Sequence, residues 1–121
     1  MTLENATGLK TFQATATAIP AFCRVKCDSS GLISAANATD AMIGVTVSAA
    51  RANGYCTVKL VNCDETVLMT ANGAITAGAI LYPAASGKVS ASGTTAIGYA
   101  ALEAATADGD VIECSKGFKG A

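Results

Sequence analysis

The chain has 121 residues and a formal net charge of −1, from eight basic and nine acidic residues. This length is typical of one domain with a single core, and the scattered charges offer no footprint for nucleic acid and no basic surface for a membrane. Histidine, the commonest general base and a common metal ligand, is absent, so an enzyme is not the expected class.

The apolar half of the composition consists mostly of small side chains. Apolar residues make up 51% of the chain, but there are only three tyrosines, three phenylalanines and no tryptophan. Each small side chain buries little area, so we expect a modestly stable core. The lack of tryptophan also disfavours a carbohydrate-binding module with a stacking platform.

The first ten residues show no hydrophobic period, and we expect an N-terminal arm over 1–10. Glu4 precedes any apolar run, which does not fit a secretory signal, and no stretch reaches the roughly 18 apolar residues of a membrane-spanning helix. We therefore expect synthesis in the cytoplasm. From Thr11 onwards, Phe12 and alanines alternate with polar residues, which predicts a half-buried strand.

Two segments of the chain match each other at an offset of 56 positions. They are "AIPAFCRVKCDSSGLIS", from Ala18, and "AITAGAILYPAASGKVS", from Ala74. Further on, Ile-Gly recurs with an offset of 54 and an Asn-Gly or Asp-Gly pair with an offset of 55. The chain therefore contains a duplicated unit, over 18–60 and 74–114. The matched residues are Ile19/Ile75, Val25/Leu81, Gly31/Gly87, Ser34/Ser90, Ile43-Gly44/Ile97-Gly98 and Asn53-Gly54/Asp108-Gly109.

Each unit is predicted to run strand, turn, strand, turn, strand. Gly31 is expected to supply the positive φ of a tight reversal, and Gly44 and Gly98 to mark a bulge or a close backbone approach. The Asn-Gly and Asp-Gly pairs predict primed hairpin turns. A further strand is expected over 67–70, and a short helix over 100–107 is left open because alanine is the best helix former.

The predicted fold class is therefore all-β. We expect a small barrel or sandwich built from the two pseudo-repeated units, forming a single β domain over 11–114. A C-terminal tail over 115–121 follows the last strand. Closure of a barrel would hide the strand edges.

Five cysteines leave three states open: Cys23, Cys27, Cys56, Cys63 and Cys114. Small buried thiols are the favoured interpretation, because no pair has the two-residue spacing of a zinc knuckle or a thioredoxin-type site. A four-cysteine metal site and a disulfide formed after release from the cell are the alternatives. A bridge between Cys56 and Cys114, at similar places in the two copies, is one such pairing.

Neither the carboxylates nor the glycines suggest a reaction centre. The acidic residues of the second half are expected to be solvated: Asp64, Glu65, Asp108, Asp110 and Glu113. The segments "GAITAG" and "ASGKVS" lack the glycine spacing and the following helix of a phosphate-binding loop. We expect no catalytic residue, no metal and no cofactor.

The second unit resembles the C-terminal half of the tailed-phage capsid decoration, or head cement, proteins. The shared scheme is an Ile-Thr-Ala-Gly entry, a strand, a Gly-Lys-Val turn, an Ile-Gly strand, an alanine-rich stretch, and Ala-x-Gly before a final strand. Here these features begin at Ile75 and end at Ile112. The many cysteines and the long tail "SKGFKGA" depart from that pattern.

The resemblance implies a β-barrel-type protein that binds the outer surface of an icosahedral phage head and stabilises the expanded capsid. The implied partners are the major capsid protein and further copies of the chain, with a trimer favoured and a dimer open. The implied location is the exterior of the virion after synthesis in the host cytoplasm. Alternatives are a tail-tube or other minor virion β protein, or a non-viral ligand-binding β module.

Four apolar residues near the chain ends are the expected contacts with the capsid or with a neighbouring subunit: Leu3, Leu9, Phe12 and Phe118. A low-charge surface rich in alanine and threonine suits close packing, because long charged side chains would have to be ordered or desolvated.

Overall fold

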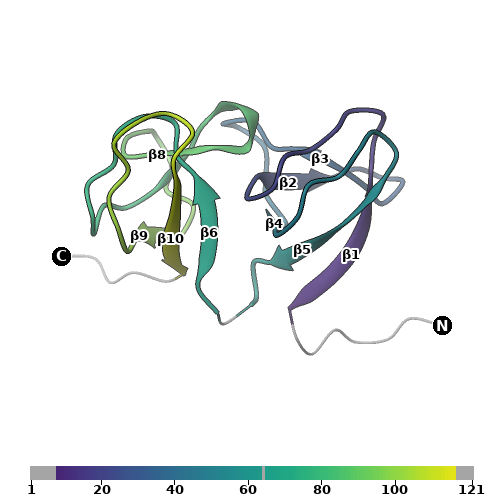
Figure 1. Ribbon diagram of the computed structural model, residues 1–121, viewed down its shortest axis with the longest axis horizontal. Coiled ribbons are helices and arrows are strands. Elements are labelled where there is room, and N and C mark those ends of the chain that lie inside the picture. Colours follow the sequence, from purple (N-terminus) through teal and green to yellow (C-terminus); the bar gives the residue numbers. More distant parts are fainter. Residues whose placement is uncertain (1–7, 64, 117–121) are drawn as a thin grey trace.

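The computed structural model describes residues 8–63 and 65–116. Within them the regular structure consists of ten β-strands and one 3-10 turn, η1 (Ala85–Gly87). The expected all-β class is confirmed. Figure 1 shows two lobes side by side, with the N-terminal half of the chain on the right and the C-terminal half on the left. No helix in the described residues is long and apolar enough to cross a membrane.

The N-terminal unit is a closed barrel of five strands in the order β1-β3-β2-β4-β5, with β5 returning to β1. The β1–β3 pair is parallel and the other pairs are antiparallel. Closure leaves this ring without an edge strand. The strands are β1 (Leu9–Ala14), β2 (Arg24–Cys27), β3 (Leu32–Ala35), β4 (Gly44–Thr46) and β5 (Tyr55–Leu60).

The C-terminal unit contains a three-stranded sheet, β6-β10-β9, and a two-stranded ribbon, β7-β8. Two isolated bridges join the ribbon to the sheet, Ile80 with Ala100 and Ala71 with Val89. The unit is therefore ring-like, with weaker connections than the N-terminal barrel. Its strands are β6 (Val67–Thr70), β7 (Tyr82–Pro83), β8 (Val89–Ser90), β9 (Tyr99–Ala101) and β10 (Val111–Lys116).

The internal repeat is visible in the strand pairing. The antiparallel pair β1–β5 matches β6–β10, and the pairs β2–β3 and β4–β5 match β7–β8 and β9–β10. Ile19 bridges Ala50 and Ile75 bridges Ala105, each through two backbone hydrogen bonds of 2.8 to 2.9 Å. Besides the segments that match in sequence, each structural unit includes the strand that precedes them, β1 or β6.

The alanine-rich stretch over 100–107 contains no helix, so the helix that the sequence left open is not formed. β9 ends at Ala101, and Ala105 pairs with Ile75. Both alanines are buried in the core of the C-terminal unit, 1% and 4% exposed. Burial along an extended backbone overrides the intrinsic helix preference of alanine, which is worth less than about 1 kcal/mol per residue.

The Asn-Gly and Asp-Gly turns are not primed turns, which corrects the sequence prediction. A primed turn of type I′ needs positive φ at both central residues, but Asn53 has a φ of 60° while Gly54 has no positive φ. In the second unit Gly109 has a φ of 96° and Asp108 has no positive φ. The residue with positive φ is therefore Asn53 in the first unit and Gly109 in the second. These two residues are structural counterparts, whereas the sequence alignment had paired Asn53 with Asp108.

The glycines inside the Ile-Gly strands have different roles. A Cβ added to Gly44 would overlap the carbonyl oxygen of Lys59 on β5, which confirms the expected close approach of two backbones. Gly98 instead has a φ of 88°, and nothing lies within 4 Å of a Cβ added there. Gly98 is therefore needed for its backbone conformation and not for close packing.

The buried apolar residues form two clusters and not the single core expected from the length. One cluster lies in the N-terminal barrel, with Val25, Ile33 and Val58 fully buried. The other lies mainly in the C-terminal unit around Met69 and Leu81. Val45 of β4 packs into this second cluster, so the N-terminal barrel contributes a side chain to the core of its neighbour.

Arg24 lies fully buried between the two units. Its Nε donates a hydrogen bond to the carbonyl of Lys88 at 2.9 Å, and its Nη2 donates to the carbonyl of Ala84 at 2.6 Å and, at 3.4 Å, to that of Ala36. Nη1 has no hydrogen-bond partner in the described part of the chain. Burial lowers the pKa of this guanidinium, and the neighbouring Cys23 and Asp40 oppose the shift. One buried cation therefore joins the N-terminal barrel to the β7–β8 ribbon.

Replacing Arg24 by methionine tests this connection. The R24M variant keeps much of the side-chain volume but removes the Arg24 donor from the buried carbonyl of Ala84 and one of two donors from that of Lys88, which keeps the N–H of Ala84. We therefore expect the free energy of unfolding to fall by about 2 kcal/mol. Urea unfolding measures the change. R51M, at an exposed arginine, is the control and should change stability by less than about 0.5 kcal/mol. Equal effects of the two substitutions would contradict the role of Arg24.

Gly31 and Gly87 form a second matched pair. Both have a positive φ, 80° and 74°, so alanine strains the backbone equally at each. A Cβ on Gly87 would also overlap Sγ of Cys23, whereas nothing lies within 4 Å of a Cβ on Gly31. We expect G87A to lose about 2 kcal/mol more stability than G31A, because only Gly87 is overpacked. Thermal or urea unfolding of both variants measures the difference, and equal losses would exclude the close contact.

Candidate functional site

Of the four expected contact residues, two lie in the described part of the chain, both on β1. Leu9 is 38% exposed at the start of the strand and pairs with Lys59. Phe12 is partly buried and packs against the core of the N-terminal barrel. Residues three apart on a strand point to opposite faces, so the structure does not bring Leu9 and Phe12 onto one surface. Leu3 and Phe118 lie outside the described residues.

The described chain begins and ends at the same edge of the molecule, the lower edge in Figure 1. Nζ of Lys116, the last residue of β10, donates to the carbonyl of Val61, just beyond β5, at 3.0 Å. Leu9 pairs with Lys59 near the end of the same strand. We call the region of Leu9, Val61 and Lys116 the terminal edge. Segments 1–7 and 117–121 are attached to the molecule there.

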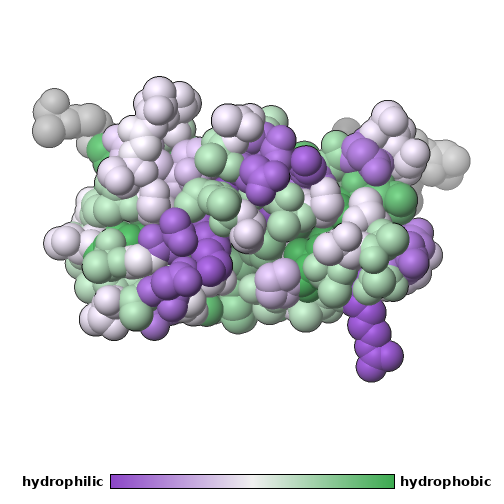
Figure 2. Space-filling model, turned by 90° about the horizontal axis from the view of Figure 1, so that it is seen from above, coloured by the Kyte–Doolittle hydropathy of each residue, from purple (hydrophilic) through white to green (hydrophobic). Residues whose placement is uncertain are grey.

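Exposed apolar side chains recur at matched positions of the two units. The backbone N–H of Val47 bonds to Thr57 and that of Leu102 bonds to Glu113, in equivalent places beside β5 and β10. Val47 is 38% exposed and Leu102 50%. The sequence analysis missed this pair, because the offset of 54 between the two Ile-Gly pairs places Val47 opposite Ala101. Only the offset of 55 found at the following Asn-Gly and Asp-Gly turns places it opposite Leu102. Figure 2 shows that hydrophilic groups form separate patches among apolar and near-neutral residues on one face.

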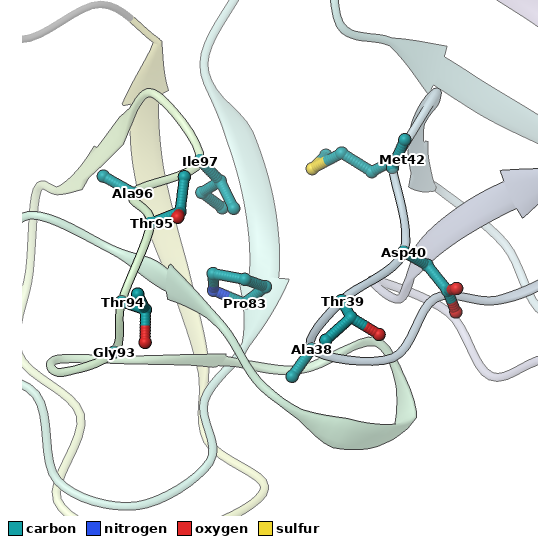
Figure 3. A pocket seen from close by; sticks show the side chains of 11 residues that line it. Ala38, Thr39, Asp40, Met42, Pro83, Gly93, Thr94, Thr95, Ala96 and Ile97 are labelled. Carbon is teal, nitrogen blue, oxygen red and sulfur yellow. The ribbon is translucent and has the colours of Figure 1, made fainter.

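A cleft of about 790 Å³ separates the β3–β4 loop of the first unit from the β8–β9 loop of the second. In Figure 3, Met42 and Asp40 line one side and Ile97 and Pro83 the other. Because the two loops are counterparts in the repeat, the cleft lies between equivalent elements. The remaining lining residues are small: Ala38, Thr39, Ala41, Gly93, Thr94, Thr95 and Ala96.

Among the described residues, Asp40 is the one ionisable group that lines the cleft, and it is already paired. Its Oδ2 lies 3.1 Å from Nζ of Lys26 and accepts the backbone N–H of Asn37 at 2.9 Å. These interactions, the N–H of Asn37 first, hold the pKa of Asp40 below its ordinary value. Lys26 already neutralises this carboxylate, and the described lining of the cleft offers no second carboxyl, thiol or amine for acid–base chemistry. The cleft is therefore suited to van der Waals contact with a partner and not to catalysis by paired titratable groups.

The acidic residues of the second half have structural roles. Asp110 accepts N–H groups of Thr106 and Ala107, which keep its pKa below the ordinary value. Glu113 accepts the hydroxyl of Thr66 at 2.7 Å, and Asp108 pairs with Lys88 at 2.8 Å. Glu65 lies 3.5 Å from Lys59 and is mostly exposed. Asp64 lies outside the described residues.

Each of the five cysteines carries a thiol, and all except Cys27 are buried. Burial raises the pKa of Cys23 to about 11, against an opposing effect of Arg24, and raises that of Cys114 to about 12. Such thiols stay protonated at neutral pH and are weak nucleophiles and weak metal ligands. Cys56 belongs to the core of the N-terminal barrel and Cys114 to that of the C-terminal unit, so these two thiols do not meet.

Within residues 8–63 and 65–116, no three cysteine or carboxylate side chains come together in a group that could hold a metal ion. The described functional features of the molecule are therefore surfaces: the terminal edge, the matched apolar positions and the cleft.

No family model and no curated protein matches this chain. Among solved structures, the crystal structure of the head fiber gp8.5 N base in bacteriophage phi29 is similar, with a TM-score of 0.72 and 15% sequence identity. The match covers 93% of this chain and 99% of that chain. This chain has the fold of that head-fiber base. The similarity extends through both units and so includes their arrangement side by side.

Thiol alkylation tests the assignment of the cysteines. At pH 8 we expect iodoacetamide to modify Cys27 in the native protein, because it is exposed. Cys23 and Cys114 should react only after denaturation, since both thiols are buried and protonated below about pH 11. Mass spectrometry of digests before and after denaturation identifies the modified residues. Rapid native modification of Cys23 or Cys114 would contradict the structure.

Proposed function

We propose that this chain is a structural protein of a bacteriophage virion that binds the outer surface of the icosahedral head. The observation that carries the proposal is the similarity in fold to a phage head-fiber base, over 93% of this chain. The resemblance of the second repeat to head decoration proteins supports the same conclusion from sequence. The proposed role is not catalytic and needs no cofactor.

The proposed partner is the major capsid protein, and the proposed effect is to stabilise the expanded capsid by bridging its subunits. Two similar units in one chain support bridging, because each can contact one of two neighbouring capsid subunits. Single contacts with small, mostly uncharged side chains are weak, but several contacts on one particle act together and dissociate rarely. Several weak contacts of this kind support a permanent structural role without a large apolar interface.

The terminal edge is the part of the surface that we propose to face the shell. Leu9 lies there with an exposed side chain, and the segments that contain Leu3 and Phe118 are attached there. Phe12 lies on the opposite face of β1 and would act by supporting the strand. Neither nucleic acid nor membrane is a proposed partner, because the net charge is only −1.

Sedimentation with phage heads tests the function. The heads should be expanded particles of the phage that encodes this chain, assembled in its absence. We expect the chain to sediment with these heads in a fixed ratio and not with purified tail tubes. Decorated heads should release their DNA at a higher temperature than bare heads. Failure to bind heads would overturn the proposal, and binding to tail tubes alone would favour a tail protein.

Two matched substitutions locate the contact. L9D places a charge on the terminal edge and should weaken head binding about tenfold, as expected when one apolar contact is lost. V111D is the control, because Val111 has similar exposure, 40% against 38% for Leu9, but lies at the opposite end of β10 from Lys116. Equal effects of the two variants would place the contact elsewhere.

A second function is favoured by the same comparison. The match covers 99% of the head-fiber base, so this chain could serve as an attachment module for a fiber and not as a stabiliser. The heating experiment separates the two functions. We expect an attachment module to bind heads without changing the temperature of DNA release, and a stabilising protein to raise that temperature.

A further inference from the structure

One of the contacts that hold the two units together is a turn of the second unit that packs on a strand of the first. The backbone N–H of Gly87 donates to the carbonyl of Ala36 at 2.7 Å, and Sγ of Cys23 lies 3.7 Å from the carbonyl of Ser86. Arg24 bonds to both ends of the same turn. We call the turn over 84–88 the docking turn, and the surface formed by Cys23, Arg24 and Ala36 the receiving face. In Figure 1, the green segment at the top centre carries this turn toward the first unit.

Since the units are repeats, the second unit has its own copy of the receiving face, and that copy is uncovered. Arg24 is 0% exposed, but its counterpart Ile80 is 36% exposed. Ala36 is also 0% exposed, and Ser92, which matches it at the same offset, is exposed. An exposed isoleucine at the centre of such a face is an apolar surface that a partner could bury.

The first unit likewise has its own copy of the docking turn, over 28–32, and it is also uncovered. Asp28 donates its N–H to Leu32 at 2.9 Å, as Ala84 does to Lys88 at 2.9 Å, so the two turns have the same backbone hydrogen bond. Gly87 is buried under Cys23, whereas Gly31 is exposed with nothing within 4 Å of an added Cβ. Each chain thus has one face and one turn that are used internally, and one of each that is open.

We infer that copies of this chain associate head to tail, with the 28–32 turn of one copy docking on the Ile80 face of the next. The contact would repeat between chains the arrangement already present within each chain. A contact between two different surfaces is heterologous, and it forms a ring when the rotation it repeats closes on itself. The inference is independent of the proposed function, since it concerns the isolated protein.

The interchain contact differs chemically from the internal one. Ile80 stands where Arg24 stands in the first unit, so an apolar side chain replaces the cation at the centre of the new contact. Asp28 stands where the buried Ala84 stands in the docking turn, so the contact also brings one carboxylate to its edge, where it already accepts the N–H groups of Ser30 and Leu32. Without an arginine it lacks the hydrogen bonds to the carbonyls of the turn, and without a buried cation it avoids the cost of desolvating one. We therefore expect weaker association than between the units of one chain, and reversible dependence on concentration.

Sedimentation velocity over a range of concentrations tests the inference on the intact chain. The wild type should form assemblies whose mass is a whole multiple of 11.9 kDa. I80E places a charge on the receiving face, and G31N places a side chain on the turn, where asparagine tolerates positive φ. Each should raise the dissociation constant at least about tenfold. The matched controls V111E and G109N, at exposed positions outside both surfaces, should assemble like the wild type.

A mixture of the two variants makes the test specific to head-to-tail contact. I80E keeps an intact turn and G31N keeps an intact face, so a one-to-one mixture should form a dimer with one contact and grow no further. A wild type that stays monomeric up to about 1 mM, the limit of weak association, would overturn the inference. So would variants that assemble with wild-type affinity, controls that dissociate as I80E does, or a mixture that remains monomeric or grows past the dimer. Urea unfolding of each variant checks that it is folded.

Discussion

The buried guanidinium of Arg24 is the interaction on which the arrangement of the two units depends. A cation without exposure to water needs hydrogen-bond acceptors, and here the acceptors are backbone carbonyls at the two ends of one turn in the other unit. Carbonyls at fixed positions in a turn leave few orientations that satisfy the cation. Arg24 therefore specifies how the units sit against each other, while Val45, packed into the neighbouring core, adds apolar contact. Gly87 permits the approach because a side chain there would overlap Cys23.

The repeat explains how small side chains can form a rigid body. Alanine, valine and glycine bury little area each, so two small cores are each modest in extent. Closing the N-terminal strands into a ring satisfies their backbone hydrogen bonds without large side chains. Duplication then adds the contact between units. The repeats differ in sequence at this contact, because the first unit has Arg24 where the second unit has Ile80.

Several titratable groups of the described chain have structural roles. Asp40 and Asp108 are paired with lysines, Asp110 caps a turn, and the buried thiols are held protonated. The surface open to a partner combines exposed apolar side chains, such as Leu9 and Leu102, with separate hydrophilic patches (Figure 2). The titratable groups with structural roles maintain a fold that is similar to that of a phage head-fiber base.

The amino-acid sequence alone determined the class of the fold and its duplication. Alternating residues and turn glycines indicate strands locally, and the offset of 56 positions between Ile19 and Ile75 revealed two units. It also predicted that most thiols would be buried. These properties can be inferred from the order of residues along the chain, without knowing which distant residues come into contact. The expected contacts Leu9 and Phe12 were chosen by their nearness to the chain ends, and that criterion could not show that they face opposite ways.

Only the tertiary structure decided which residues meet across the repeat. Nothing near Arg24 in the sequence indicates that its partners are Ala84 and Lys88, because 60 or more positions separate them. The alanines at 101 and 105 favour a helix by themselves and become extended because the core of the second unit covers them. The difference between Gly31, which is open, and Gly87, which is buried, also arises after folding. Both glycines serve the same turn, and the neighbouring unit covers only one of them.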